Sequence, residues 1–588
     1  MKPRYQSPPT LIVLLLSLLV GHAIWGLLPA HAQGQVQVTA ADPFAAEQGT
    51  INLNVKVTGK GFKNGAQAKW FVTGTTNPGG VTVNSTTFVS SSELTANITV
   101  AETADIANFD IQVLNSDGRG GKGTELFAVT AKGAGNLICP PQQPAPTTDT
   151  KCYAAQPGCL DSTFGGVGFV HPHVGNADQY NVGQEVVVQA DGKLVVASGR
   201  MDPATSFDIV ILRYNADGSL DTSFGDPNSS NPPLRLGYTI TTLSTASDTI
   251  NGLTLQPDGK IVVCGSANGL GGESVVMRYT SEGTLDATFG NGGIVTLNFG
   301  KRVAAPNTEV AVQADGKIVI GGSSDGRFAV VRLLPNGSVD LSFGSNGIVF
   351  ANASGVKTGL SYGISLALQR VPAVTGEERI ILGGHSKSSS QAIQKWALMR
   401  FKPNGVVDTG FGGGGIVKTD FSGFDDGVHK VIIDSNNRII AAGNTASANF
   451  NCGGYVIDSA IVRYNENGSL DLSFGGGKQI VDLYGGRDEL AAVAAYPDNK
   501  IVILDWAHSS DFTVKNFALV KFNADGSRDF SFGILGNGVV TTDFAYGSNS
   551  ANSMVLQPND GKIVALGTAE FAPVNGAQRD IVTARYWP

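Results

Sequence analysis

A motif of the form LDxSFG occurs seven times from residue 160 onward, with successive copies 54 to 68 residues apart. Self-similarity at a nearly fixed period is typical of propellers, solenoids and other repeat architectures, so it restricts the fold more than any other feature. The aspartates of the seven copies are Asp161, Asp221, Asp286, Asp340, Asp408, Asp471 and Asp529.

Each repeat holds four short apolar runs separated by turn residues. In the second copy, residues 186–199 contain two runs around Asp191 and Gly192, and residues 207–225 contain a third run followed by the motif. Apolar runs of four to eight residues bounded by Gly, Asp and Asn predict strands, and an Asp-Gly pair suits a tight hairpin. A fourth run follows each SFG, as at residues 292–299.

Four strands per repeat and seven repeats predict an all-β, seven-bladed β-propeller of four-stranded blades over residues 160–588. A solenoid is the alternative. The first motif has no Arg-Tyr strand before it, and the last Arg-Tyr strand, at Arg585 and Tyr586, has no motif after it. These two incomplete ends complement each other, so we expect the N-terminal piece to complete the last blade and close the ring.

The paired elements QPDGKIVVxG and RYNxDGSLDxSFG resemble the repeats of bacterial delta-60 repeat proteins, a β-propeller family of unknown function. The resemblance covers residues 160–588 and implies the fold without assigning catalytic residues. Residues 375–384 and 434–443 lack the Asp-Gly turn, and Asp498 and Asn499 replace it in another copy. We expect looser or different hairpins there.

The first 32 residues have the pattern of a secretory signal peptide. Lys2 and Arg4 precede an apolar run, and cleavage is expected after Ala32. An uncleaved anchor is the alternative, because the apolar stretch reaches about 18 residues. Both readings predict an exported protein, secreted or at the cell surface.

Residues 33–131 contain their own alternating runs and predict an Ig-like β-sandwich. The spacing of Gly49, Gly59 and Phe62 resembles the IPT/TIG family of Ig-like domains, which implies binding or spacing rather than catalysis. Residues 132–159 form a linker rich in Pro and Cys. In an exported protein, its Cys139, Cys152 and Cys159 predict one disulfide, with three pairings open.

The formal net charge of -8 becomes more negative if the first 32 residues, with their two basic side chains, are removed. An acidic protein lacks the clustered Lys and Arg that phosphate backbones require, so we expect no nucleic-acid partner. We also expect a monomer with no membrane contact beyond the signal segment.

The Arg of the recurring Arg-Tyr strand could line a channel and bind anions, but we expect it to pair with a motif aspartate of its own or an adjacent blade. Asn215, Asp217 and Asp221 resemble a truncated calcium loop, but its first ligand position is not kept in all the other copies, and no terminal bidentate Glu follows. His171 and His173 could ligate a metal, although a solvated loop is the simpler reading. We therefore expect no cofactor and no metal site, with calcium as the remaining candidate. The repeated arginines are Arg213, Arg278, Arg332, Arg400, Arg463 and Arg585.

No nucleophile elbow, P-loop or zinc-protease motif occurs in the chain. We predict no catalytic residues and an exported, non-catalytic binding or scaffold protein that presents a rigid propeller to a protein or glycan. The alternative is an extracellular polysaccharide hydrolase or lyase with a site at the channel mouth, where exposed carboxylates such as Asp425, Asp426, Asp488 and Glu489 would act.

Overall fold

The protein is described from a computed structural model. It describes residues 36–588 except 43–44, 106, 131–154, 175–179, 268–272, 298–308, 354–359, 371–376, 388–393, 422–425, 448–455, 484–486, 509–514, 545–548 and 572–577. The predicted signal peptide, and Cys139 and Cys152 of the predicted linker, lie outside the described residues. Among the residues described, none forms a helix with the length and apolarity that a membrane span needs.

The chain divides into two compact units, and each is described by itself. The described N-terminal unit holds two four-stranded sheets, with strand orders β1-β3-β6-β5 and β2-β8-β7-β4. Its strands are β1 (Gln37–Asp42), β2 (Ala45–Glu47), β3 (Leu53–Lys60), β4 (Gln67–Val72), β5 (Val81–Ser90), β6 (Glu93–Val100), β7 (Asn108–Leu114) and β8 (Gly120–Thr130).

One buried core joins the two sheets of this unit. Val55 and Leu94 come from the first sheet, and Trp70, Ile111 and Phe127 come from the second. The Trp70 and Phe127 rings meet edge to face, with their centroids 5.9 Å apart. Inward residues alternate with outward ones along β6, as expected for a strand with one face in a core.

The described C-terminal unit forms seven four-stranded sheets, numbered here sheet 1 to sheet 7. Sheet 1 is β10 (Asn181–Val188), β11 (Leu194–Asp202), β12 (Ser206–Tyr214) and β13 (Tyr238–Thr241). Sheet 2 is β14 (Asp248–Leu255), β15 (Ile261–Ala267), β16 (Glu273–Tyr279) and β17 (Ile294–Leu297). Sheet 3 is β18 (Glu309–Val312), β19 (Ile318–Ser324), β20 (Arg327–Leu333) and β21 (Ile348–Ala351). Sheet 4 is β22 (Leu360–Arg370), β23 (Glu378–Lys387), β24 (Lys395–Phe401) and β25 (Ile416–Thr419).

The remaining sheets continue the pattern. Sheet 5 is β26 (Asp426–Ile433), β27 (Ile439–Ser447), β28 (Val456–Tyr464) and β29 (Lys478–Val481), the last preceded by a 3-10 turn, η3 (Gly475–Gly477). Sheet 6 is β30 (Asp488–Ala495), β31 (Ile501–His508), β32 (Lys515–Phe522) and β33 (Val539–Thr542). Sheet 7 is β34 (Asn549–Leu556), β35 (Ile563–Phe571), β36 (Gln578–Tyr586) and β9 (Phe169–Val170).

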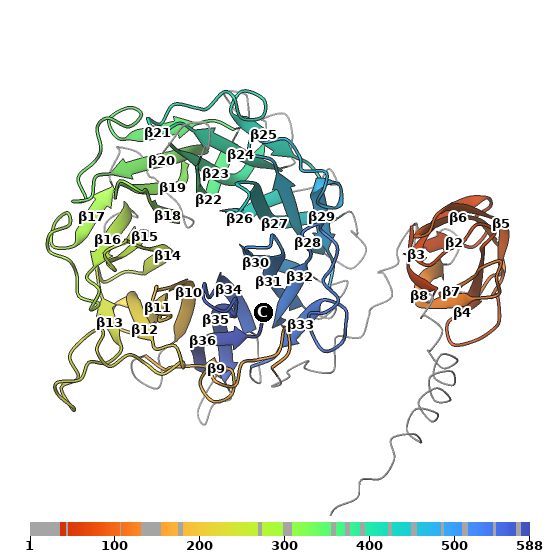
Figure 1. The fold of residues 1–588 in the computed structure, drawn as a ribbon, viewed down its shortest axis with the longest axis horizontal. Coiled ribbons are helices and arrows are strands. Elements are labelled where there is room, and N and C mark those ends of the chain that lie inside the picture. Colours follow the sequence, from red (N-terminus) through yellow and green to blue (C-terminus); the bar gives the residue numbers. More distant parts are fainter. Residues whose placement is uncertain are drawn as a thin grey trace, which may run out of the picture. The chain divides into compact units, whose positions relative to one another are not determined.

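The sheets stand around a common centre, with the first strand of each innermost (Figure 1). Each strand pairs antiparallel with the next in its sheet, so every sheet is a meander running outward. Buried apolar clusters fill the space between neighbouring sheets; one of them joins Val263 of sheet 2 to Val195 of sheet 1. This all-β, propeller-like arrangement agrees with the expected fold class.

Sheet 7 takes its outermost strand from the other end of the unit. Phe169 and Val170 of β9 pair with Ala584 and Thr583 of β36. Leu160 also bridges to Tyr586, just before the first motif. The two incomplete ends of the repeat region therefore complete one sheet, as their phases predicted.

Two of the turns expected to be looser are ordinary. The Asn437 amide donates to the Asp434 carbonyl at 3.0 Å, as the Gly192 amide does to Gln189 at 2.9 Å in sheet 1. Asn437 has a φ of 62° and occupies the left-handed position that Gly192 fills at 85°. Asn499 in sheet 6 adopts the same conformation with a φ of 67°. The expectation was wrong at these two turns, because Asn tolerates this conformation better than other non-glycine residues.

Candidate functional site: a cavity at the inner strands

The innermost strands of six sheets carry a β-bulge at the same position. At each bulge the strand register shifts by one residue, which leaves one residue without a partner on the next strand. Bulges re-aim side chains, and all six of these residues line one cavity of about 300 Å³. They are Gln184, Asn251, Ile364, His429, Ala491 and Asn552.

The position after the bulge brings three charged side chains together from sheets 1, 3 and 5. Lys430 Nζ lies 2.6 Å from Glu309 Oε1 and 3.4 Å from Glu185 Oε1. Two serines at the same position in other sheets hold the carboxylates: Ser365 donates to Glu309 at 2.7 Å, and Ser553 donates to Glu185 at 3.0 Å. These ion pairs and hydrogen bonds connect sheets 1, 3, 4, 5 and 7 through a ring of polar side chains in the cavity wall.

Burial shapes the ionisation of this ring. Burial raises the pKa of Glu185, and the nearby Glu309 adds to the rise while Lys430 opposes it. For Lys430, burial disfavours the ammonium, but the two carboxylates outweigh that effect and raise its pKa. The lysine therefore stays charged and is the cation that keeps two glutamates in one enclosed space.

His429 faces the cavity as a neutral imidazole. Burial lowers its pKa, against the opposing effects of the Leu490 carbonyl and Glu489. Its Nδ1 lies 3.2 Å from the Leu490 carbonyl oxygen, which can only accept a hydrogen bond. Nδ1 therefore carries the proton in the neutral ring, and Nε2 is left as an acceptor.

Sheet 6 adds an aromatic and a carboxylate to the cavity lining. Glu489 and Trp506 pair across β30 and β31, and both line the cavity. Arg487 forms an ion pair with Glu489, and Lys515 Nζ lies 5.1 Å from the Trp506 ring centroid. This part of the wall offers a flat apolar ring beside charged groups.

The repeated arginines and aspartates lie elsewhere, in the outer half of each sheet. In the six sheets with Arg, its Nε donates to an oxygen of the motif aspartate of the same sheet at 2.7 or 2.8 Å. Nη1 donates to a carbonyl in the turn of the next sheet; in sheet 5, for example, Arg463 reaches Ala524 O at 2.8 Å. The guanidinium also covers the Phe of the motif, at 4.5 Å for Arg213 and Phe224. The ion pair is thus within a sheet, and the contact between sheets goes to backbone.

Sequence reasoning missed the basic residue that completes this pair. The Lys after each Asp-Gly turn reaches the motif aspartate, as Lys193 does to Asp221 at 2.8 Å, and Arg379 and Arg438 replace it in the diverged copies. In sheet 6, where Lys521 replaces the usual Arg, Lys500 holds Asp529 at 2.9 Å. The available signal was a Lys or Arg directly after the hairpin turn in every repeat that has an LDxSFG motif, with DGK in four of the copies.

The residues that the sequence suggested as metal ligands form contacts with other protein groups. Asp217 Oδ1 accepts from the amide and hydroxyl of Ser219 at 2.9 and 2.6 Å, and Asp221 is held by Arg213 and Lys193. His173 Nδ1 lies 2.7 Å from Asp580 Oδ1, and the His171 ring stacks on Phe571 with centroids 4.1 Å apart.

Cys159 is disulfide-bonded, but its partner lies outside the described residues, so the pairing with Cys139 or Cys152 stays a prediction.

Two carboxylates expected to be exposed at the channel mouth are not exposed. Asp426 and Asp488 are 1% and 0% exposed, because each begins an inner strand and accepts a backbone amide from the preceding loop. Glu489 does line the cavity, and Asp425 is outside the described residues.

A fixed sequence offset marks the cavity residues. In the five sheets whose following turn is described, the bulge residue stands five positions before the residue that starts that turn, as Gln184 stands before Gln189 and His429 before Asp434. The side chain at that offset differs from copy to copy, and so does the residue after it, which is Glu185 in sheet 1, Ser365 in sheet 4 and Lys430 in sheet 5.

The fold and its repeats define a β-propeller protein. The family model described as "Domain of unknown function (DUF5122) beta-propeller" matches six segments of the chain, at residues 189–224, 256–289, 313–343, 379–411, 435–474 and 497–532. Each segment runs from the turn after the inner strand to the LDxSFG motif. The chain therefore contains a β-propeller domain of unknown function. No curated protein matches the chain.

Solved structures similar to the chain include enzymes and other propellers. A catalytically inactive virginiamycin B lyase from Staphylococcus aureus is 10% identical over 71% of this chain and 99% of its own, with a TM-score of 0.35. The β-propeller domain of the Trilobed protease from Pyrococcus furiosus is 10% identical over 70% and 94%, with a TM-score of 0.35. A polysaccharide lyase of family PL25, an ulvan lyase, is 10% identical over 67% and 90%, with a TM-score of 0.37.

Proposed function

We propose that this chain is an exported, non-catalytic binding protein in which a seven-bladed propeller holds a polar ligand, a glycan or a peptide segment, in its central cavity. An N-terminal Ig-like domain of the IPT/TIG type would space the propeller from the cell surface.

One observation carries the proposal: six sheets use the same backbone irregularity to direct one side chain each into one cavity. A bulge disrupts strand pairing locally, and bulges are over-represented beside functional sites. The outer half of six sheets keeps the same Arg–Asp pair, and sheet 6 holds its motif aspartate with Lys500, whereas the cavity positions vary among amide, imidazole and aliphatic side chains. Binding sites are commonly built in this way, with variable residues held in place by a constant, rigid framework.

The cavity offers hydrogen-bonding capacity that the protein leaves unused. Asn251 lines it, and among the described residues the Asn251 Nδ2 atom meets no acceptor. The neutral His429 ring leaves Nε2 as an acceptor. Trp506 supplies a flat face of the kind that stacks on a sugar ring or an aromatic side chain. Donor, acceptor and flat apolar surface together suit a polar ligand with ring faces.

A second candidate function, a polysaccharide hydrolase or lyase, rests on His429 and Glu489. Both line the cavity, and the charge of Glu489 acts on the His429 ring. A neutral imidazole beside a carboxylate can act as a general base. A turnover screen on polysaccharide substrates separates the two functions: turnover that His429→Asn abolishes, with folding intact, would establish the enzyme.

The binding proposal is tested with residues 33–588 on glycan and peptide arrays, followed by calorimetry on the strongest ligand. Asn251→Ala and Trp506→Ala should each weaken binding about tenfold, which corresponds to about 1.4 kcal/mol. Leu472→Ser is the matched control, because Leu472 is 72% exposed and does not line the cavity. If Asn251→Ala and Trp506→Ala bind the ligand as tightly as Leu472→Ser does, the cavity is not the binding site.

A further inference from the structure

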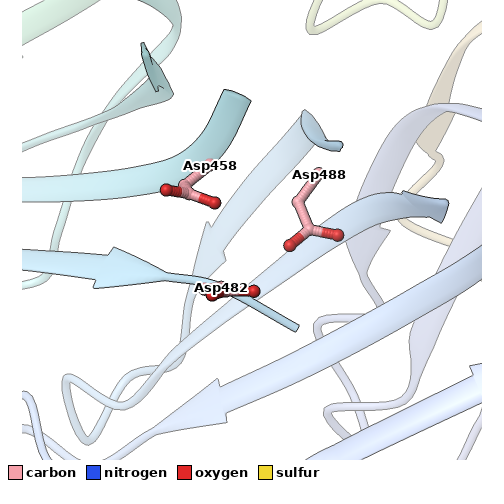
Figure 2. Close-up of side chains that lie close together, drawn as sticks. All are labelled: Asp458, Asp482 and Asp488. Atoms are coloured by element: carbon pink, nitrogen blue, oxygen red, sulfur yellow. The ribbon is translucent and has the colours of Figure 1, made fainter. Parts of the chain in front are cut away.

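Three aspartates converge at the boundary between sheets 5 and 6. Asp458 lies in β28, Asp482 follows β29, and Asp488 begins β30. One carboxylate oxygen from each lies within 4.8 Å of one from each of the others. Figure 2 shows the three carboxylates turned toward a common point. Asp458 and Asp488 are buried and Asp482 is exposed, so the cluster is open to solvent on one side.

A fourth carboxylate, Asp505, lies beside the three. It is 0% exposed, and neither of its oxygens meets a donor in good geometry among the described residues, although the Ser459 hydroxyl and the Trp506 backbone amide lie close enough to favour its ionised form. Asp505 pairs with Leu490 across β31 and β30, two residues from Asp488, so both carboxylates leave the same face of sheet 6. Leu490 on that face packs in a core with sheet 5.

Comparison with the other sheets shows that Asp505 is an addition. At the matching position, paired with the residue before the bulge, the repeat has a glycine in four other sheets. These glycines are Gly265, Gly384, Gly443 and Gly567. An added Cβ at Gly443 would lie only 2.0 Å from the Gly427 carbonyl oxygen. A side chain would therefore be costly at Gly443, whereas sheet 6 carries an acidic one at this position and sheet 1 carries Ser198.

The three converging positions recur at other sheet boundaries. Each set joins a residue of the third strand, a residue at or just after the end of the fourth strand, and the first residue of the next inner strand. The other sets that the structure describes in full are Asp208, Thr242 and Asp248; Lys395, Asp420 and Asp426; Asn516, Asp543 and Asn549; and Asp580, His173 and Asn181.

In these other sets a cation, an amide or an imidazole meets the carboxylates. Arg200 lies 2.9 Å from Asp208, and Lys395 forms an ion pair with Asp420. Asn549 donates to Asp543 at 3.0 Å, and His173 lies 2.7 Å from Asp580. Of the five described sets, only the one between sheets 5 and 6 consists of three carboxylates.

None of the main influences on the ionisation of Asp458, Asp488 and Asp505 among the described residues is a basic side chain. Burial raises the pKa of Asp458 to about 7, and the charges of Asp482 and Asp505 add to the rise. The Oδ1 atoms of Asp458 and Asp488 also meet no donor. Buried carboxylates are normally paired or coordinate metals, and these two oxygens have no donor among the described residues, although Asp488 Oδ2 accepts the Leu483 amide.

We propose that Asp458, Asp482 and Asp488 bind a hard divalent cation, of which Ca²⁺ is the first candidate, with Asp505 adding negative charge to the site. Carboxylate oxygens from several strands are the ligands that Ca²⁺ takes in flexible geometry. The exposed Asp482 gives the ion its entry path. Asp488 precedes Glu489 in β30, and neighbouring residues of a strand face opposite ways, so the bound ion would fix the strand that carries part of the cavity wall.

The test is calorimetric titration of chelator-treated residues 33–588 with CaCl₂, MgCl₂ and MnCl₂, together with the melting temperature at each concentration. Asp482→Asn removes one ligand charge at an exposed position and should weaken Ca²⁺ binding at least tenfold. Asp543→Asn is the matched control, because Asp543 holds the same position at the boundary of sheets 6 and 7, and its affinity should stay within twofold of the parent.

The proposal predicts about one bound Ca²⁺ per chain and a higher melting temperature with Ca²⁺. In Asp482→Asn it predicts at least tenfold weaker binding and a smaller rise in melting temperature at the same Ca²⁺ concentration. Two outcomes would overturn it: no binding of any of the three cations at millimolar concentration, or equal binding by Asp482→Asn and the parent. In the second case the ion would be bound elsewhere. Both outcomes leave the cavity proposal intact, since the array experiment uses other residues.

Discussion

Arg585 and Asp161 are 424 positions apart in the sequence, yet Arg585 Nε donates to Asp161 Oδ2 at 2.7 Å. Lys562 Nζ lies 3.0 Å from the same oxygen. Burial alone would raise the pKa of Asp161, but the Thr163 hydroxyl, Lys562 and Arg585 together lower it. In the other sheets with this Arg–Asp pair, both residues belong to one repeat. In sheet 7 the pair joins the two ends of the propeller.

Asp161→Ala should therefore destabilise the propeller strongly, because it leaves the buried Arg585 without its carboxylate, while the half-buried Lys562 keeps Asp560 as a partner. Removing one partner of a buried ion pair costs about 3 to 5 kcal/mol. Asp217→Ala, in an exposed turn of sheet 1, should cost far less. Urea unfolding of residues 33–588 measures both, and equal losses would show that the Arg585 contact does not stabilise the closed sheet.

Lys430→Met should destabilise the propeller by about 2 to 4 kcal/mol, since Glu185 and Glu309 would then share the enclosed ring without a cation. Adding Glu309→Gln to Lys430→Met should recover much of this loss, because one negative charge is removed. Thermal unfolding of the single and double variants tests this coupling. A double variant less stable than the single one would show that Lys430 acts by packing rather than by charge.

Stability should depend on pH through Asp426. Burial raises its pKa from 3.8 to about 6, and Asp420 adds to the rise while Thr445, the Phe421 amide and Lys395 oppose it. The folded state thus holds a proton that the unfolded chain releases, so this residue lowers stability as the pH rises from about 4 to about 6. Asp426→Asn should be more stable than the parent by roughly 1 to 3 kcal/mol at pH 7, with a smaller difference at pH 4. A difference that does not change with pH would contradict the raised pKa.

The architecture followed from the sequence because its determinants are local and repeated. An Asp-Gly turn such as Asp191-Gly192 fixes a hairpin within a few residues, and the phase of the two chain ends leaves one way to complete the last sheet. The Arg–Asp pair could be anticipated for the same reason. Where both residues lie in one repeat they are eight positions apart, as Arg213 and Asp221 are. The pair's second cation, Lys193, is 28 residues from Asp221 and was not expected.

The cavity and the aspartate cluster could not be predicted from the same patterns. Glu185, Glu309 and Lys430 meet only because three sheets place them around one centre, and no local spacing relates them. Asp505 was visible as a departure from the repeat, in KIVILD, where five other copies have glycine and one has Ser198. Its meaning depends on Asp458 and Asp482 of the neighbouring sheet, which only the fold brings close.

Hydrogen–deuterium exchange with and without the strongest array ligand tests the central claim, that the inner-strand cavity is the binding site. We predict slower exchange on ligand addition in the inner strands, above all at residues 428–431 of β26 and 489–492 of β30. Protection confined to the outer strands of the sheets, or to residues 36–130 of the N-terminal unit, would contradict it.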